Sequence, residues 1–321
     1  MRKASALIVT AGLVMTALTA CASPGTAQTS CDTPITSGGA SQLVSASGDF
    51  GSTPDVTFPT PLKSTSTQRT EIIPGTGAKA VAGQQLNVEL NVYNATSGEV
   101  IQQGAYDGAN LIPVVLNGAG LKGLSDGLLC AQVGERVAIV VSPEDAFGAA
   151  GSEQFQVAPT DSLVVVADVV SAFLPRANGV DQTVANSLPA VVLDDNGVPG
   201  VVVPSGDAPT ALEVGVLKKG AGAKVTEGST VTVNYSGVLW KEKTVFDSSW
   251  VNGSPVSLVA AVGSATQPGV IAGMATALTG QTVGSQIVMV IPPSLAYGST
   301  ANGAVPGDST LIFVVDILGV N

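Results

Sequence analysis

The most informative stretch of the chain, residues 231–249, reads VTVNYSGVLWKEKTVFDSS. From Val231 to Tyr235 apolar residues alternate with polar ones, which is the pattern of a β-strand that buries one face. The same alternation runs from Leu86 to Leu90. Two similar strands are therefore predicted far apart in the sequence.

The sequence around these two strands is repeated as well. A glycine-rich segment that ends in lysine precedes each strand, at 74–79 and 219–224, and an apolar strand that contains one Asp closes each unit. Similarity at a fixed offset is the signature of internal duplication. We therefore predict two related domains, a first copy at residues 71–173 and a second copy at residues 212–321.

Helical segments are scarce in both copies. The chain has 38 Gly and 19 Pro, which favour turns over helices. Each copy offers one short helical candidate, Leu121–Leu129 and Gly269–Leu278. A strand-rich unit with one short helix predicts an α+β fold, in which an antiparallel sheet wraps a helix.

The composition excludes several kinds of chemistry. The chain contains no histidine, which excludes a Ser-His-Asp triad, a Cys-His pair and a zinc site built on histidine. A formal net charge of −11 disfavours a nucleic-acid partner, because phosphate binding needs a basic surface. We predict no metal site and no cofactor. Any activity is expected to rely on carboxylates, hydroxyls, backbone amides or an apolar cavity.

Residues 1–21 are predicted to be a targeting segment. A basic start at residues 2–3 precedes an uncharged, mostly apolar run at residues 4–20, which is the pattern of a secretory signal peptide. The sequence LTAC at 18–21 resembles a bacterial lipobox, which would make Cys21 the lipidated residue that holds the protein on a lipid bilayer outside the cell. The alternative is a secreted protein without an anchor that has a cysteine near its cleavage site.

The remaining cysteines and the two connecting segments complete the organisation of the chain. With Cys21 set aside, two cysteines remain, Cys31 and Cys130. An even number of cysteines in an oxidising compartment predicts a disulfide between them, and the alternative is two separate buried thiols. Residues 22–70, rich in Ser, Thr, Gly and Pro, are predicted to form a flexible stalk with weak order at 42–51. Residues 174–211 are a linker, for which the sequence leaves open loosely docked strands or a semi-rigid spacer.

Five short motifs of the second copy occur in the order of a known enzyme family. They are Val233-Asn234-Tyr235-Ser236-Gly237, Val245-Phe246-Asp247-Ser248-Ser249, Gly269-Val270-Ile271-Ala272-Gly273-Met274, Ala296-Tyr297-Gly298 and Thr310-Leu311-Ile312-Phe313. Over its whole length this copy resembles the FKBP-type peptidyl-prolyl cis-trans isomerases. The resemblance implies two FKBP-like domains, each an antiparallel β-sheet half-wrapped around one short α-helix, and an apolar pocket between sheet and helix.

The resemblance also implies which residues form that pocket. The residues expected to act in catalysis are Tyr235, Phe246, Asp247, Ile271 and Tyr297. The residues expected to bind the substrate are Val256, Val270, Met274, Ala304, Val305 and Phe313. Met274 stands where many members have a Trp, which keeps the pocket floor apolar but removes a flat ring. Taken singly, most of these are ordinary core or turn residues, and it is their order as a set that indicates the pocket.

A chain without histidine can catalyse rotation about an Xaa–Pro bond. Its barrier of about 18–20 kcal/mol arises from amide resonance, so no proton has to move. An apolar pocket disfavours the charge-separated planar amide and accepts the twisted amide, which is stronger binding of the transition state than of the ground state.

The first copy departs from the family pattern. Gln102 replaces Asp247, Phe147 replaces Tyr297, and most aromatic positions become aliphatic, so we predict a weakly active or inactive copy. The complete prediction is a bacterial lipoprotein that isomerises Xaa–Pro bonds in proline-containing polypeptides folding outside the cell. The alternative is a non-catalytic, peptide-binding or chaperone-like surface lipoprotein. The binding of tacrolimus-like macrolides is left open.

Overall fold

The computed structural model describes residues 35–320 of the chain. The elements up to the end of the first copy are η1 (Ser41–Leu43), β1 (Ser45–Ser47), β2 (Asp55–Thr57), β3 (Gln68–Ile73), β4 (Gln85–Asn94), β5 (Val100–Gln102), β6 (Ile112–Val115), α1 (Lys122–Leu128), β7 (Arg136–Val141), η2 (Gly148–Ala150) and β8 (Leu163–Ala172). Those that follow are β9 (Val180–Asp181), β10 (Ala190–Leu193), β11 (Pro199–Val202), β12 (Glu213–Lys219), β13 (Thr230–Leu239), β14 (Val245–Ser248), β15 (Val256–Val259), α2 (Ala272–Leu278), β16 (Gln286–Ile291), η3 (Pro293–Leu295) and β17 (Leu311–Val320).

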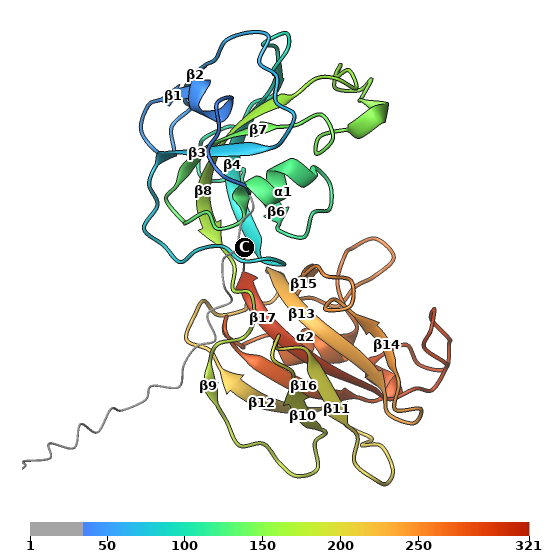
Figure 1. The fold of residues 1–321 in the computed structure, drawn as a ribbon. Coiled ribbons are helices and arrows are strands. Elements are labelled where there is room, and N and C mark those ends of the chain that lie inside the picture. The colour runs from blue at the N-terminus through green and yellow to red at the C-terminus, as the bar shows by residue number, and fades with distance from the viewer. Residues whose placement is uncertain (1–34, 321) are drawn as a thin grey trace, which may run out of the picture. The chain divides into compact units, whose positions relative to one another are not determined.

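Each copy is built around one antiparallel sheet, and the two sheets have the same strand order except that the second has one more edge strand, β9 (Figure 1). The first runs β3-β7-β8-β4-β5, with β6 paired to the other end of β4. The second runs β9-β12-β16-β17-β13-β14, with β15 paired to the other end of β13. Antiparallel sheets with few helices are what the sequence predicted.

One face of each sheet packs against its helix. In the first copy Leu128 of α1 is buried among alternate residues of β4, β7 and β8. In the second, Met274 and Leu278 of α2 are buried among alternate residues of β13, β16 and β17. α1 begins one residue and α2 three residues after its predicted start, and each helix is seven residues long. Burial of these apolar faces is the main source of stability.

The opposite face of the first sheet is covered by the segment that precedes it, which differs from the predicted flexible stalk. The apolar residues of this covering segment, residues 35–67, pack against the outward side chains of β7 and β8. They are Ala40, Val44, Ala46 and Leu62, and they meet Ala138, Val140, Val164 and Val166. A segment poor in apolar residues becomes ordered here because the sheet face that it covers is itself apolar.

The linker covers the second sheet in the same way. Leu188 and Val203 pack with Trp240 and with the outward residues of β16 and β17. In Figure 1, β10 and β11 lie over one face of this sheet and α2 lies over the other. Of the two alternatives that the sequence left open, the structure has docked strands. Each repeated unit therefore includes its covering segment and begins before the predicted boundaries at 71 and 212.

A buried ion pair fixes the covering segment to the first sheet. Arg136 and Asp168 have no exposed side-chain surface, and the Arg136 Nε donates to Asp168 Oδ1 at 2.6 Å. The guanidinium also donates to the carbonyls of Gly48 and Ser52, and the N–H of Gly51 donates to Asp168 Oδ2. Every charge of the pair is therefore met by hydrogen bonds, which burial of an ion pair requires.

The second sheet has a neutral counterpart at the same position. Asp316 pairs with Gln286 across β16 and β17, as Asp168 pairs with Arg136. Gln286 Nε2 donates to Asp316 at 2.7 Å, and the N–H of Ala177 in the linker donates at 2.8 Å. Burial outweighs these hydrogen bonds and the charges of Lys218 and Arg176, and it raises the pKa of Asp316 to about 6.

Only some of the predictions about the cysteines and the membrane concern residues that the structure describes. Cys130 is disulfide-bonded, whereas Cys21 and Cys31 lie outside the described residues, so the Cys31–Cys130 pairing and the lipidation stay predictions. The targeting segment at 1–21 lies outside them too. From residue 35 to residue 320, no helix has the length and apolar character needed to cross a membrane.

Candidate active site

A glycine in β13 creates the space for the candidate site. Gly237 lies between Asp247 of β14 and Phe313 of β17 in the sheet register. A Cβ at this glycine would lie 2.6 Å from Phe246 Cζ and 3.0 Å from Phe313 Cε1. Because such contacts are far shorter than van der Waals separation, only glycine lets the two rings lie over the strand.

Three aromatic rings from three adjacent strands form one end of the site. The centroids of Phe246 and Phe313 are 5.6 Å apart with an interplanar angle of 86°. The rings of Tyr235 and Phe313 are 6.1 Å apart at 53°. Edge-to-face and tilted packing of this kind is favourable for aromatic rings. The result is a rigid apolar wall that is open on one side.

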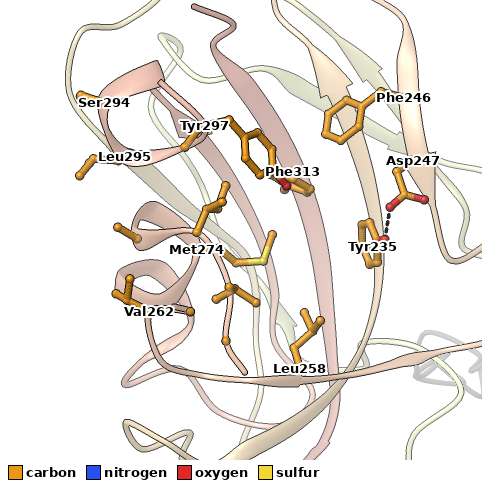
Figure 2. Close-up of a pocket in the computed structure, with 16 residues that line it drawn as sticks. Tyr235, Phe246, Asp247, Leu258, Val262, Met274, Ser294, Leu295, Tyr297 and Phe313 are labelled. Atoms are coloured by element: carbon orange, nitrogen blue, oxygen red, sulfur yellow. Dashed lines mark hydrogen bonds between the residues drawn. The ribbon is translucent and has the colours of Figure 1, made fainter. Parts of the chain in front are cut away.

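The polar edge of this wall is a tyrosine–carboxylate pair. The Tyr235 hydroxyl donates a hydrogen bond to Asp247 Oδ2 (Figure 2). Burial, followed by the hydrogen bond and the negative charge of Asp247, raises the pKa of Tyr235 above its ordinary value. The phenol therefore stays protonated and holds the exposed carboxylate in a fixed orientation.

The start of α2 forms the opposite side of the site. The carbonyl of Ile271 accepts the N–H groups of Met274 and Ala275, each at 3.0 Å. Gly273 allows the helix to approach the sheet, since a Cβ there would lie 2.4 Å from Ile291 Cγ2. Among the described residues, the backbone N–H of Ile271 has no hydrogen-bond acceptor, so it is free to bind a peptide carbonyl.

These elements line a cavity of about 490 Å³ that is open to solvent. Eight of the predicted site residues line it, namely Tyr235, Phe246, Asp247, Val270, Ile271, Met274, Tyr297 and Phe313. Met274, only 6% exposed, lies between the helix and the sheet, and Tyr297, 37% exposed, lies at the rim (Figure 2).

Three predicted residues do not line the cavity. Val256 pairs with Val233 on β13, outside the cavity wall. Val305 is buried in the core cluster, and Ala304 is exposed to solvent. Ala304 and Val305 lie in the loop before β17, which folds on itself through the bridge between Asn302 and Val305.

Sequence reasoning missed several cavity residues. They are Leu258, Val262, Gly263, Gly269, Ala272, Ser294, Leu295 and Ala296. Leu258 lies two positions after Val256 on the same face of β15, so period-two alternation gave a usable signal for it. The others lie in loops or at helix ends, where residue type alone carries no such signal.

The corresponding place in the first copy is filled. Val92 occupies the register position of Gly237, between Gln102 and Val165. Ile101 packs against the core cluster, and Phe147 stacks on Phe155 with centroids 5.7 Å apart. A side chain therefore stands where the second copy has the space for its aromatic wall.

Comparison with known proteins identifies the family. The family described as FKBP-type peptidyl-prolyl cis-trans isomerase matches residues 76–167 and 221–318, more than half of the chain. The chain belongs to the FKBP family. It contains two FKBP domains, and its activity is that of a peptidyl-prolyl cis-trans isomerase, an enzyme that accelerates rotation about Xaa–Pro bonds.

The FKBP relatives align with about a third of the chain. The FK506-binding protein 2 of Yarrowia lipolytica is 38% identical over 115 residues, which are 34% of this chain and 76% of that protein. The FK506-binding protein of Streptomyces anulatus is 35% identical over 125 residues, 38% of this chain and 96% of that protein. The structure of the three FKBP domains of wheat FKBP73 covers 79% of this chain and 94% of its own, with 22% identity and a TM-score of 0.35.

Proposed function

We propose that isomerisation takes place in the cavity of the second FKBP domain. The observation that carries this proposal is the joint presence of an aromatic wall, a free N–H at Ile271 and the Tyr235–Asp247 pair around one cavity. The proline ring packs against Phe246 and Phe313 over Met274. The Ile271 N–H and the Tyr297 hydroxyl hold the peptide carbonyls on either side.

The catalytic effect comes from binding the twisted amide more strongly than the planar one. A planar Xaa–Pro amide carries separated charge, which an apolar wall solvates poorly, whereas the twisted amide has lost that resonance. Two fixed hydrogen bonds keep the backbone on either side of the bond in place while it rotates. The reaction needs no proton transfer and so no histidine.

The first FKBP domain is proposed to be weakly active or inactive. Val92 fills the space that Gly237 leaves in the second domain, and Gln102 and Phe147 provide neither a carboxylate nor a phenol. Its role would be that of a spacer or a peptide-contacting module.

We further propose an extracytoplasmic location with a lipid anchor on Cys21. The supporting observation is the LTAC sequence at 18–21 after an apolar run. The disulfide at Cys130 suits an oxidising compartment and supports Cys31 as its partner. The clients would then be proline-containing polypeptides folding outside the membrane. Binding of tacrolimus-like macrolides belongs to the same proposal, because relatives are named for binding FK506.

Cis–trans exchange in a proline peptide, followed by NMR with the full chain, tests the enzymatic proposal. Tyr297→Phe removes a hydrogen bond worth about 1–1.5 kcal/mol, so exchange should slow about tenfold. Asp247→Val should slow exchange by a similar factor, because it removes the carboxylate that accepts the hydrogen bond of the Tyr235 hydroxyl. Tyr93→Phe, a matched change in the first domain, should leave exchange unchanged. Wild-type exchange no faster than in buffer would leave the non-catalytic binding module as the function.

A further inference from the structure

Asparagine followed directly by glycine is a chemically labile pair. Asparagine is thermolabile, and a following glycine makes it more so, because a backbone without a Cβ lets the glycine nitrogen reach the asparagine side chain. The chain has five such pairs, all of them within the part that the structure describes. They are Asn117-Gly118, Asn178-Gly179, Asn196-Gly197, Asn252-Gly253 and Asn302-Gly303. The local structure decides which of them can react.

The backbone N–H of the glycine distinguishes one pair from the other four. In those four the N–H donates a hydrogen bond, to Ser125 Oγ at 3.0 Å and to the carbonyls of Gly284, Asp194 and Trp250 at 2.9, 3.0 and 3.2 Å. Among residues 35–320, the N–H of Gly303 has no acceptor and the side-chain amide of Asn302 has no hydrogen-bond partner. Both residues are exposed to water. The attacking nitrogen and the amide that it attacks are therefore both free at Asn302-Gly303.

Asn302 also begins a tight turn in the loop before β17. The N–H of Asn302 donates to the carbonyl of Val305, and the N–H of Val305 donates to the carbonyl of Asn302, each at 2.9 Å. Gly303 has a φ of +55°, which glycine adopts without strain. The turn therefore depends on the normal backbone length at Asn302.

This turn is connected to the candidate active site through two contacts. Val305, only 4% exposed, belongs to the core cluster that contains Met274 and Phe313. At the base of the same loop the N–H of Asp308 donates to the carbonyl of Gly298 at 2.8 Å, directly after Tyr297 at the rim of the cavity. A change in the backbone at Asn302 would therefore act on residues that support the cavity.

The first copy has a corresponding turn without the labile pair. Ser152 and Val157 exchange two backbone hydrogen bonds, at 2.7 and 2.9 Å, in the way that Asn302 and Val305 do. Residues 153–156 lie between them and read EQFQ, so neither asparagine nor glycine is present. The labile turn is therefore a feature of the second domain.

We propose that Asn302 is a site of spontaneous deamidation. The Gly303 nitrogen gives up its proton to water and bonds to Asn302 Cγ. The Cγ–Nδ2 bond breaks, and Nδ2 takes a proton from water and leaves as ammonia. Water then opens the resulting succinimide ring at either carbonyl, which produces aspartate or isoaspartate.

The two products affect the loop differently. Each adds one negative charge, but only isoaspartate adds a carbon atom to the main chain. That additional atom breaks the paired hydrogen bonds between Asn302 and Val305, so Val305 leaves the core cluster and exchange at the cavity slows. This consequence rests on the proposed function of the cavity, whereas the deamidation itself does not.

Ageing of the full chain at mildly alkaline pH, followed by chymotrypsin digestion and mass spectrometry, tests the chemistry. Cleavage after aromatic residues gives fragment 298–313, in which Asn302 is the only asparagine, and fragment 251–297, in which Asn252 is the only one. Asn302 should deamidate about fivefold faster than the other four pairs, the rate equivalent of a hydrogen bond worth about 1 kcal/mol. Another pair that reacts as fast or faster would overturn the proposal.

Two variants connect the chemistry to activity. Asn302→Ser installs the residue that the first copy has at position 152, and it should keep its rate of proline-peptide exchange during ageing. Asn252→Ser, the matched control, should lose exchange in step with the isoaspartate content, as the wild type does. Isoaspartate at position 302 without any loss of exchange would refute the connection to the cavity. Absence of exchange before ageing would refute catalysis, while the mass measurement would still decide the deamidation.

Discussion

Replacing Gly237 with alanine tests whether the aromatic wall depends on an empty position in β13. The new Cβ would meet Phe246 Cζ at 2.6 Å, and ordinary contact begins at 3.4 Å. The Phe246 ring must therefore move by roughly 0.8 Å, because the strand backbone is fixed between β14 and β17. Phe246 is half-buried, so it can move outward into the cavity.

The size of the expected effect follows from that displacement. Inserting a methyl group into a packed site costs about 1–3 kcal/mol of unfolding free energy. A displacement of about 1 Å at a reacting centre costs up to about 100-fold in rate. We therefore expect Gly237→Ala to remain folded and to lose between roughly 10-fold and 100-fold in kcat/KM.

The assay combines exchange in a proline peptide with urea unfolding of the same samples. Gly200→Ala in β11 is the matched control, since its Cβ would meet only Val192 O at 3.5 Å, and it should keep full activity. A folded Gly237→Ala protein with activity within about twofold of the wild type would refute the packing argument.

Two further predictions concern the buried carboxylates. Burial raises the pKa of Asp316 from 3.8 to about 6, so the folded state binds the Asp316 proton more tightly than the unfolded state does. Ionisation of Asp316 therefore lowers the free energy of unfolding as pH rises from about 4 to about 6. Asp316→Asn should therefore be more stable than the wild type by about 2–3 kcal/mol at pH 7 and nearly equal to it at pH 4, as measured by urea unfolding; an equal difference at both pH values would contradict this. Arg136→Leu leaves Asp168 buried without its partner and should cost about 3–5 kcal/mol and expose residues 48–52 to protease. Adding Asp168→Leu should restore most of that stability, and an unchanged melting temperature in the single variant would rule out the anchoring role.

The strands and helices were predictable because local patterns determine them. Alternation located β4 and β13, and the one short helical candidate of each copy located α1 and α2 to within three residues. The covering segments were missed because their composition is typical of flexible chain. A signal existed in the strands themselves: β7 and β8 read RVAIVV and LVVVADVVSA, and an apolar run without alternation indicates burial on both faces.

The candidate site was predictable where it lies on regular elements. Tyr235 and Phe313 stand on long strands whose register the fold fixes, and Ile271 stands at the start of the helix. Val256 and Val305 do not line the cavity, because the path of a loop or a short strand depends on contacts distant in sequence. Val262 was missed for the same reason, since only the folded 260–271 loop brings it to the cavity.

The central claim is that isomerisation belongs to the cavity of the second FKBP domain. The most direct measurement is NMR exchange of a proline peptide by the full chain and by the double variant Phe246→Ile, Asp247→Gln. These substitutions install the residues that the first domain has at Ile101 and Gln102, so a folded protein is expected. We predict fast exchange by the wild type and exchange close to the rate in buffer by the variant, in which only the weakly active or inactive first domain is unchanged. A variant that remains as active as the wild type would contradict the account.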